Sequence, residues 1–244
     1  MSVWEFAGFV LVGFAAQAVD GALGMAYGVT ATTLLLTLGI PPAVASATVH
    51  LAECVTAGVS GLSHHAFGNV DRFLFRRLIV PGVIGAAAGA YLLATVPGDL
   101  FRWVVSAYLL LMGALIVVKV FRPFPPRAVT THLVPLGLVG GFLDAVGGGG
   151  WGPIVATNLI VRGREARFAI GSSSAVEFFV AAAASLAFIV TLGAIPWEIT
   201  AGLALGGAFG APVGAWACRR MPTRALMIGV GLLIVALSLR NLLG

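Results

Sequence analysis

The stretch Phe142–Pro153 reads FLDAVGGGGWGP and lies inside an apolar run that is long enough to enter a lipid bilayer. In a helix interior, glycine costs about 1 kcal/mol relative to alanine, and proline costs about 3 kcal/mol. Four consecutive glycines followed by a proline therefore end a helix that arrives from the N-terminal side. The run is predicted to contain two short helical pieces joined by an irregular turn.

The composition is that of an integral membrane protein. Of the 244 residues, 59% are hydrophobic and only 9% are charged, whereas soluble domains carry about 25% charged residues. The mean hydropathy is +1.05. Apolar runs of about 20 residues recur along the chain, which predicts an all-α fold and not a membrane β-barrel, whose strands are runs of about 10 residues. We expect a multi-pass protein of the inner (plasma) membrane.

Other classes of protein fit the sequence poorly. The net charge is +5, but the basic residues flank apolar runs, where they indicate topology and not a nucleic-acid partner. Cys54 and Cys218 are too few for a disulfide framework or a cysteine-based metal site. We expect no metal and no cofactor. The first apolar run, from Val3, lacks the basic region and cleavage site of a signal peptide and is expected to stay in the mature protein.

The chain contains an internal duplication. A shift of 124 residues aligns Asp20 with Asp144 and Glu53 with Glu177, together with Gly13 and Gly137, Gly24 and Gly148, Gly28 and Gly152. With one more residue the match continues through Gly82 and Gly207, Gly85 and Gly210, Gly89 and Gly214. We therefore predict two homologous membrane repeats, residues 1–122 and 130–244, joined by a cytoplasmic linker at residues 123–129.

Each repeat is expected to hold a broken hairpin of two short helices and three longer transmembrane helices. The hairpin arms are predicted at 4–19 and 27–38 in the first repeat, and at 133–143 and 151–161 in the second. The longer helices are predicted at 43–62, 76–95 and 101–121, and at 167–190, 197–218 and 223–242. Pro41, Pro97, Pro196 and Pro222 mark junctions between these pieces.

The basic residues predict the topology. Four connections carry twelve of the fourteen basic residues: Arg72, Arg76 and Arg77; Lys119, Arg122 and Arg127; Arg162, Arg164 and Arg167; Arg219, Arg220 and Arg224. The positive-inside rule puts these connections in the cytoplasm and both termini outside. Equivalent connections of the two repeats then lie on opposite sides of the membrane, so the repeats are expected to be inverted.

The hairpin arms look too short to cross a bilayer. At about 1.5 Å per residue, 12 to 16 residues reach only about 18 to 24 Å, against a hydrocarbon core of about 30 Å. The hairpins are therefore expected to be re-entrant or barely spanning, with their glycine-rich turns near mid-membrane. Irregular backbone at that depth requires a covering of protein or a water-filled cavity, and we expect a cavity.

This architecture favours a secondary transporter. Inverted repeats with discontinuous helices bind their substrate at the repeat interface near the midplane. Free backbone amides at the start of an arm attract anions, which nominates Gly21, Gly24, Gly147, Gly148, Gly149 and Gly150. The hydroxyl groups of Ser172, Ser173 and Ser174 are candidate donors to a bound oxyanion, with His50 as a further candidate. The alternative is that the glycines only allow close backbone packing.

Four carboxylates lie in apolar surroundings. Glu53 and Glu177 fall near the middle of predicted helices, where an ionised carboxylate needs a cavity, a partner or a proton. We interpret them as substrate-binding or proton-relay groups, or as hydrogen-bonding groups that fix the hairpins. Asp20 and Asp144 stand directly before the breaks, where an aspartate can cap the next turn as well as relay a proton.

The paired segments GFAAQAVDGALGMAYG and GLVGGFLDAVGGGGWGP, each followed by a serine- and threonine-rich helix that carries a glutamate, resemble the sulfite exporter TauE/SafE family of membrane permeases. The resemblance covers essentially the whole chain. It implies outward transport of a sulfur-containing oxyanion such as sulfite, sulfoacetate or a related organosulfonate, with proton coupling as an option. The residues themselves fit any small oxyanion, and a homodimer is compatible with them.

The competing function is a cation or proton channel or transporter that uses the same carboxylates. An enzyme is not expected, because the sequence has no nucleotide-binding motif and no HExxH metal motif.

Overall fold

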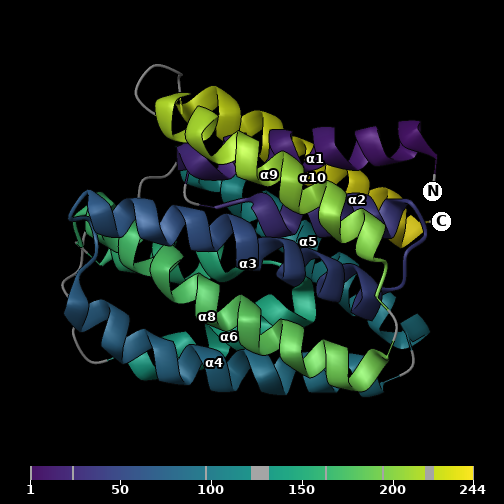
Figure 1. Cartoon of the computed structure of the whole chain (residues 1–244), viewed down its shortest axis with the longest axis horizontal. Helices are drawn as coiled ribbons and strands as arrows, with labels where there is room; N and C mark the ends of the chain where they lie inside the picture. The colour runs from purple at the N-terminus through teal and green to yellow at the C-terminus, as the bar shows by residue number, and fades with distance from the viewer. Residues whose placement is uncertain are drawn as a thin grey trace.

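The structure is a computed structural model that describes residues 2–23, 25–96, 98–121, 132–162, 164–193, 195–217 and 223–243. Every regular element in these ranges is a helix, as the composition predicts (Figure 1). The predicted first repeat contains α1 (Val3–Leu23), α2 (Tyr27–Thr37), α3 (Pro42–Ala66), α4 (Arg72–Thr95) and α5 (Gly98–Phe121). The second contains α6 (Leu133–Gly147), η1 (Gly152–Ala156), α7 (Thr157–Val161), α8 (Ala166–Leu192), α9 (Trp197–Ala217) and α10 (Thr223–Leu243).

The lengths of the helices confirm a membrane fold. Five segments are long and apolar enough to cross a bilayer: Val3–Asp20, Pro42–Ala66, Arg72–Thr95, Trp103–Phe121 and Phe168–Leu192.

The expected length of the first hairpin arm is wrong. The first arm was expected to be short, but α1 has 21 residues and reaches about 31 Å at about 1.5 Å per residue. The first repeat has only isolated glycines where the second has four in a row, and a helix tolerates isolated glycines at modest cost.

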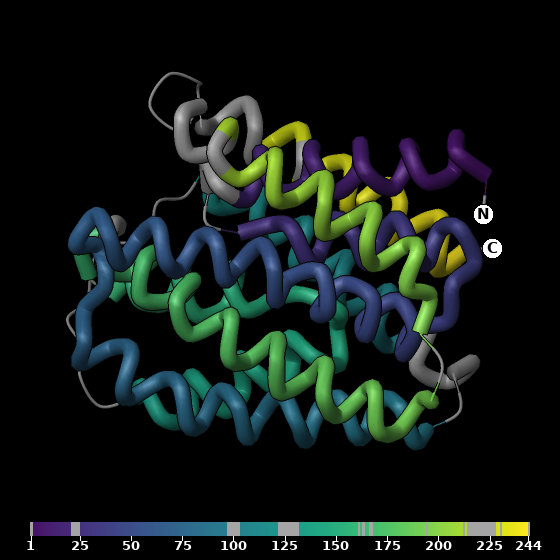
Figure 2. Tube along the Cα trace, in the orientation of Figure 1, coloured from purple at the N-terminus to yellow at the C-terminus, as the bar shows by residue number. Residues whose placement is uncertain are grey.

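Helices α3 and α8 pack together in the middle of the molecule (Figure 1). On one side, α9 packs against α3 and α1 packs against α9; on the other, α4 packs against α8 and α6 packs against α4. Helices α5 and α10 form a further pair. Figure 2 follows the central α3 and α8 side by side, with α4 on one side of them and α9 on the other. The first hairpin arm of each repeat therefore packs against a long helix of the other repeat.

Glycines allow these helices to approach closely. A Cβ added to Gly85 of α4 would overlap the carbonyl oxygen of Leu138 on α6. The corresponding glycine of the second repeat, Gly210 of α9, faces the carbonyl oxygen of Phe14 on α1 in the same way, at 2.5 Å. The glycine-rich faces of α4 and α9 thus confirm the close helix packing that small residues favour in lipid.

The α3–α4 connection lies at one end of the molecule (Figure 1). At this end, the hydroxyl of Ser172 near the start of α8 accepts a hydrogen bond from the backbone N–H of Asp71, just before α4, at 2.8 Å. The Arg164 guanidinium lies 3.8 Å from the Asp71 carboxylate. The two chain termini lie at the opposite end (Figure 1). Residues 123–129, the expected linker, fall outside the described ranges.

Candidate functional site

The glycine run forms the break that the sequence predicts. Helix α6 ends at Gly147, and Gly148 caps it in the left-handed conformation with φ 68°. Gly149 and Gly150 follow with φ values of 141° and 154°. Side chains rarely adopt three such conformations in succession, so this path requires glycine. The chain then resumes as the π-helical turn η1 before α7, a local geometry that is common at functional sites.

Asp144 accepts hydrogen bonds from backbone amides at this break. Its Oδ1 accepts a hydrogen bond of 2.8 Å from the backbone N–H of Trp151, and its carbonyl accepts one of 2.9 Å from the N–H of Gly149. The equivalent Asp20 accepts a hydrogen bond from the N–H of Tyr27 at 3.3 Å. Amides that were expected to be free for an anion are therefore held by Asp144, and an anion at Gly149 or Trp151 would have to displace it.

The two hairpin breaks touch each other. A Cβ added to Gly28, at the start of α2, would lie 2.6 Å from the Cα of Gly149 and 2.7 Å from Oε1 of Glu53. The hydroxyl of Thr32 on α2 donates a hydrogen bond to the carbonyl of Gly148. The start of α2 and the break after α6 thus lie against each other, beside the carboxylate of Glu53 on α3.

His50, Glu53 and Asp144 form a buried cluster at this contact. Nε2 of His50 lies 3.2 Å from Oδ2 of Asp144, and a carboxylate oxygen of Glu53 lies within 4.8 Å of both groups. The three side chains are 0%, 4% and 1% exposed, in that order. Oε2 of Glu53 has no hydrogen-bond partner. An unpaired carboxylate oxygen in such a buried place calls for a proton or a cation.

Glu177 lies in a second group of polar residues. A small cavity of about 10 Å³ is lined by Gln17, Asp20, Tyr27, Glu53, Thr56, Ala57, Ser60, Ser174 and Glu177. One water molecule requires about 10 to 15 Å³ on this measure, so the cavity is too small for an oxyanion in this conformation. The cavity brings together three of the four nominated carboxylates and one of the three nominated serines.

The other nominated residues lie in different places. Ser172 is bonded to Asp71 at the α3–α4 connection, away from the breaks. The carbonyl of Ser173 accepts a hydrogen bond of 3.1 Å from the indole N–H of Trp151, and its own hydroxyl is buried without a partner. Gly21 belongs to α1, and Gly24 falls outside the described residues.

Three residues near the breaks were missed by the sequence reasoning. Tyr108 of α5 donates a hydrogen bond of 3.1 Å to the carbonyl of Gly149. Trp151 is fully buried against the same break. Lys119 was interpreted only as a topology signal, yet its Nζ contacts the hydroxyl of Thr157 on α7 and lies 3.7 Å from Sδ of Met25. The available signal was a charged residue near the end of the otherwise uncharged span Trp103–Phe121.

The chain matches a known family along nearly its whole length. The model of the family described as sulfite exporter TauE/SafE matches residues 9–241. The chain belongs to the sulfite exporter TauE/SafE family. It is 40% identical to the probable membrane transporter protein YtnM of Bacillus subtilis (strain 168), over 96% of this chain and 82% of that protein. It is 26% identical to the probable membrane transporter protein YdhB of the same organism, over 83% of this chain and 84% of that protein.

No solved structure is significantly similar to this TauE/SafE family member. The family and its apolar helices make the chain a multi-pass membrane transporter, which is not an enzymatic kind of function.

Proposed function

We propose that this transporter exports a small sulfur-containing oxyanion, such as sulfite, sulfoacetate or a related organosulfonate, across the plasma membrane. The observation that carries the proposal is the contact between Gly28 and Gly149, where a discontinuous hairpin of each repeat reaches the other. Secondary transporters bind their substrates where such broken helices meet near the midplane. The sulfur chemistry comes from the family to which the chain belongs.

The proposed architecture is a pair of inverted repeats, residues 1–122 and 130–244. Reciprocal contacts support it: α4 of the first repeat packs on α6 of the second, while α9 of the second packs on α1 of the first. The ends of the molecule support it too, because the α3–α4 connection contacts Arg164 and Ser172 of the other repeat. By the positive-inside rule this end faces the cytoplasm and both termini lie outside.

A basic vestibule favours entry of an anion from the proposed cytoplasmic end. A cavity of about 540 Å³ lies among α3, α4 and α8 and is lined by His65, Arg72 and Arg76 together with Phe75, Phe178 and Phe179. Positively charged clefts raise the local concentration of anions, and the aromatic rings suit the organic part of an organosulfonate. The inside-negative potential favours export by about 2.3 kcal/mol per charge per 100 mV.

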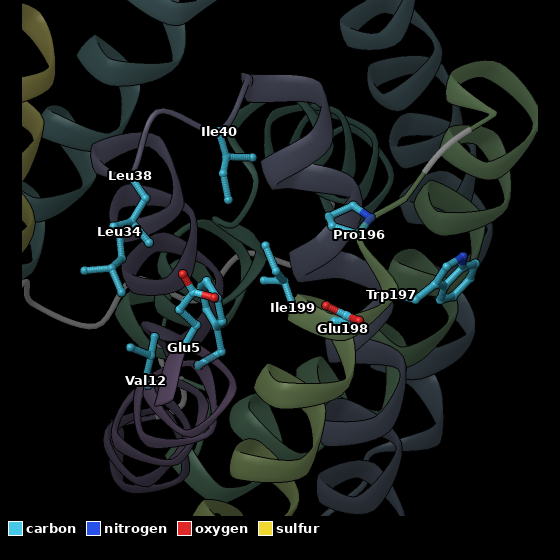
Figure 3. Close-up of a pocket in the computed structure, with 11 residues that line it drawn as sticks. Glu5, Val12, Leu34, Leu38, Ile40, Pro196, Trp197, Glu198 and Ile199 are labelled. Atoms are coloured by element: carbon cyan, nitrogen blue, oxygen red, sulfur yellow. The ribbon is translucent and has the colours of Figure 1, made fainter. Parts of the chain in front are cut away.

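The opposite end has an acidic and apolar opening. A cavity of about 800 Å³ is lined by Glu5 of α1 and Glu198 of α9, among apolar side chains such as Leu34 and Ile199 (Figure 3). Negative groups at the proposed outer end disfavour anion entry and favour release. The difference in charge between the two ends therefore supports outward transport.

A tight helix crossing separates the basic vestibule from the central polar cavity. A Cβ added to Gly61 of α3 would lie 3.0 Å from Cα of Ala175 on α8. Gly61 and Ala175 line the vestibule, and the neighbouring Ser60 and Ser174 line the small polar cavity. We propose that movement of α8 against α3 opens this crossing, so that the anion reaches Ser174 from the vestibule.

Carboxylates beside an anion must be neutralised. Glu177 and Asp20 line the same cavity as Ser174, and a proton on Glu177 would allow an anion to bind there. We therefore propose that export is linked to proton movement through Glu177. The alternative is uncoupled export driven by the membrane potential alone, which would not respond to a pH gradient.

Efflux from proteoliposomes tests this function. Vesicles containing the purified protein are loaded with sulfite, sulfoacetate, sulfate or chloride, with and without an imposed pH gradient. The proposal expects saturable, sulfite-selective efflux that responds to the gradient, and loss of that response in Glu177→Gln. Efflux that does not respond to the pH gradient would contradict proton coupling and leave the proposed anion export standing. A cation leak without anion flux would favour a cation pathway and overturn the proposed substrate.

A further inference from the structure

His50 presents one ring nitrogen to a backbone carbonyl and the other to the carboxylate of Asp144 in the buried cluster. Nδ1 of His50 lies 2.8 Å from the backbone carbonyl of Ser46, and because a carbonyl only accepts, Nδ1 carries the hydrogen. Nε2 of His50 faces Oδ2 of Asp144 at 3.2 Å, and a carboxylate only accepts. A proton on Nε2 satisfies this pair, and so does a metal ion bound between Nε2 and Oδ2. The unpartnered Oε2 of Glu53 beside the pair is the observation that favours a metal ion.

We infer that His50, Glu53 and Asp144 bind a divalent transition-metal ion at the contact between the two hairpin breaks. One imidazole nitrogen and two carboxylate oxygens are ligands that zinc and similar ions accept. Metal-binding histidines usually donate their other ring N–H to a carboxylate, a backbone carbonyl or water, and here Nδ1 lies 2.8 Å from the carbonyl of Ser46. The unpartnered Oε2 of the buried Glu53 supplies the third ligand from a neighbouring turn of α3.

The distances fit a site that closes on binding. Ligands of a tetrahedral zinc ion, with bonds of about 2.0–2.1 Å, lie about 3.4 Å apart. His50 and Asp144 are already 3.2 Å apart, and the carboxylate of Glu53 lies within 4.8 Å of them. A movement of the Glu53 carboxylate by at most about 1.4 Å brings it to this spacing.

The surrounding contacts hold the ligands in place from two helices. The hydroxyl of Ser46 donates a hydrogen bond of 2.6 Å to the carbonyl of Ala145, next to Asp144. Trp151 N–H holds the other oxygen of Asp144. An ion at this point would join α3 of the first repeat to the end of α6 of the second, and so fix the hairpin break of the second repeat.

The duplication provides a matched control. The position equivalent to His50 is Ser174, so the equivalent group of Asp20, Ser174 and Glu177 lacks the imidazole nitrogen. We therefore expect a transition-metal ion at the first cluster alone. Glu177→Gln should leave metal binding unchanged, whereas Glu53→Gln should weaken it.

Direct metal binding tests the inference. The full-length protein, purified in detergent without a histidine tag and stripped with EDTA, is titrated with Zn²⁺ against a chromogenic zinc chelator, with Mg²⁺ as comparison. We expect one Zn²⁺ per chain, at least tenfold weaker binding in His50→Gln and in Glu53→Gln, and no change in Glu177→Gln. Size-exclusion chromatography and circular dichroism establish that each variant is folded.

The histidines at the end of α3 are the competing zinc site. His64 and His65 are adjacent in the sequence, on the last turn of α3. A double His64→Ala and His65→Ala variant should still bind one Zn²⁺ with the affinity of the unmodified protein. The inference is overturned if zinc binding survives in His50→Gln, if it disappears in the double variant, or if the unmodified protein binds no Zn²⁺.

Discussion

Gly149→Ala should disrupt the contact between the two hairpin breaks. An alanine Cβ at this position would overlap the backbone carbonyl carbon of Gly28 and lie 2.6 Å from its Cα. The backbone at Gly149 also has φ 141°, which side chains rarely adopt and which costs about 1–3 kcal/mol. Overpacking a close contact costs about 1–3 kcal/mol more. The free energy of unfolding should therefore fall by about 2–6 kcal/mol.

Substitutions at two other glycines, Gly39 and Gly8, distinguish the cost of backbone strain from the cost of the close contact. Gly39 has φ 84° with open space around its Cα, so Gly39→Ala should carry only the backbone cost of about 1–3 kcal/mol. Gly8 has neither a positive φ nor a neighbour within 4 Å of an added Cβ. Because it lies inside α1, Gly8→Ala should be neutral or stabilising by up to about 1 kcal/mol.

The assay is thermal unfolding in detergent, followed by intrinsic fluorescence, together with efflux from proteoliposomes. At about 2–4 °C per kcal/mol for a chain of this size, Gly149→Ala should lower the melting temperature by about 10 °C and Gly39→Ala by about 5 °C. Gly149→Ala should also slow efflux, whereas Gly39→Ala should not. Equal melting temperatures for the two variants, with normal efflux in Gly149→Ala, would refute a close contact between the breaks.

Three further substitutions test single contacts. Lys119→Gln removes a positive charge that contacts Thr157 on α7 near the breaks; because a positive charge raises the local concentration of anions, anion efflux from proteoliposomes should slow, with little change in melting temperature. Trp151→Phe removes the indole hydrogen bond to Ser173 and leaves unfilled space at a fully buried position, so stability should fall by more than the about 1 kcal/mol of the hydrogen bond alone, seen as a melting temperature more than about 2–4 °C lower. Asp71→Ala removes the cap of α4 and should cost about 1 kcal/mol while efflux stays normal; an efflux defect without destabilisation would contradict a purely structural role.

Hydropathy and the backbone preferences of glycine and proline made much of the fold predictable from the sequence. The all-α membrane class followed from hydropathy, and the break after α6 followed from four consecutive glycines, which a helix interior disfavours. Helix boundaries followed from the same signals: α2 was predicted to begin at Tyr27 and does, and α9 was predicted to begin at Trp197 and does. The first arm was misjudged because the isolated glycines of the first repeat do not end α1.

The candidate site was only partly predictable. Carboxylates in apolar runs are conspicuous by their cost, so Glu53, Glu177, Asp20 and Asp144 were identified from sequence. The serine-rich start of α8 was read as one group of oxyanion donors, but Ser172 bonds to Asp71 at a helix connection. Neighbours in a helix point to different faces, and sequence alone does not say which face meets which helix.

The amino-acid sequence by itself determined the membrane environment and the position of the break after α6, because these depend on hydropathy and on the backbone preferences of glycine. Only the tertiary structure decided which side chains meet. His50 and Asp144 are 94 residues apart and belong to different repeats. In lipid, helix pairing depends on close packing of small residues and on polar contacts and not on apolarity, so the meeting of His50, Glu53 and Asp144 depends on how the helices pack.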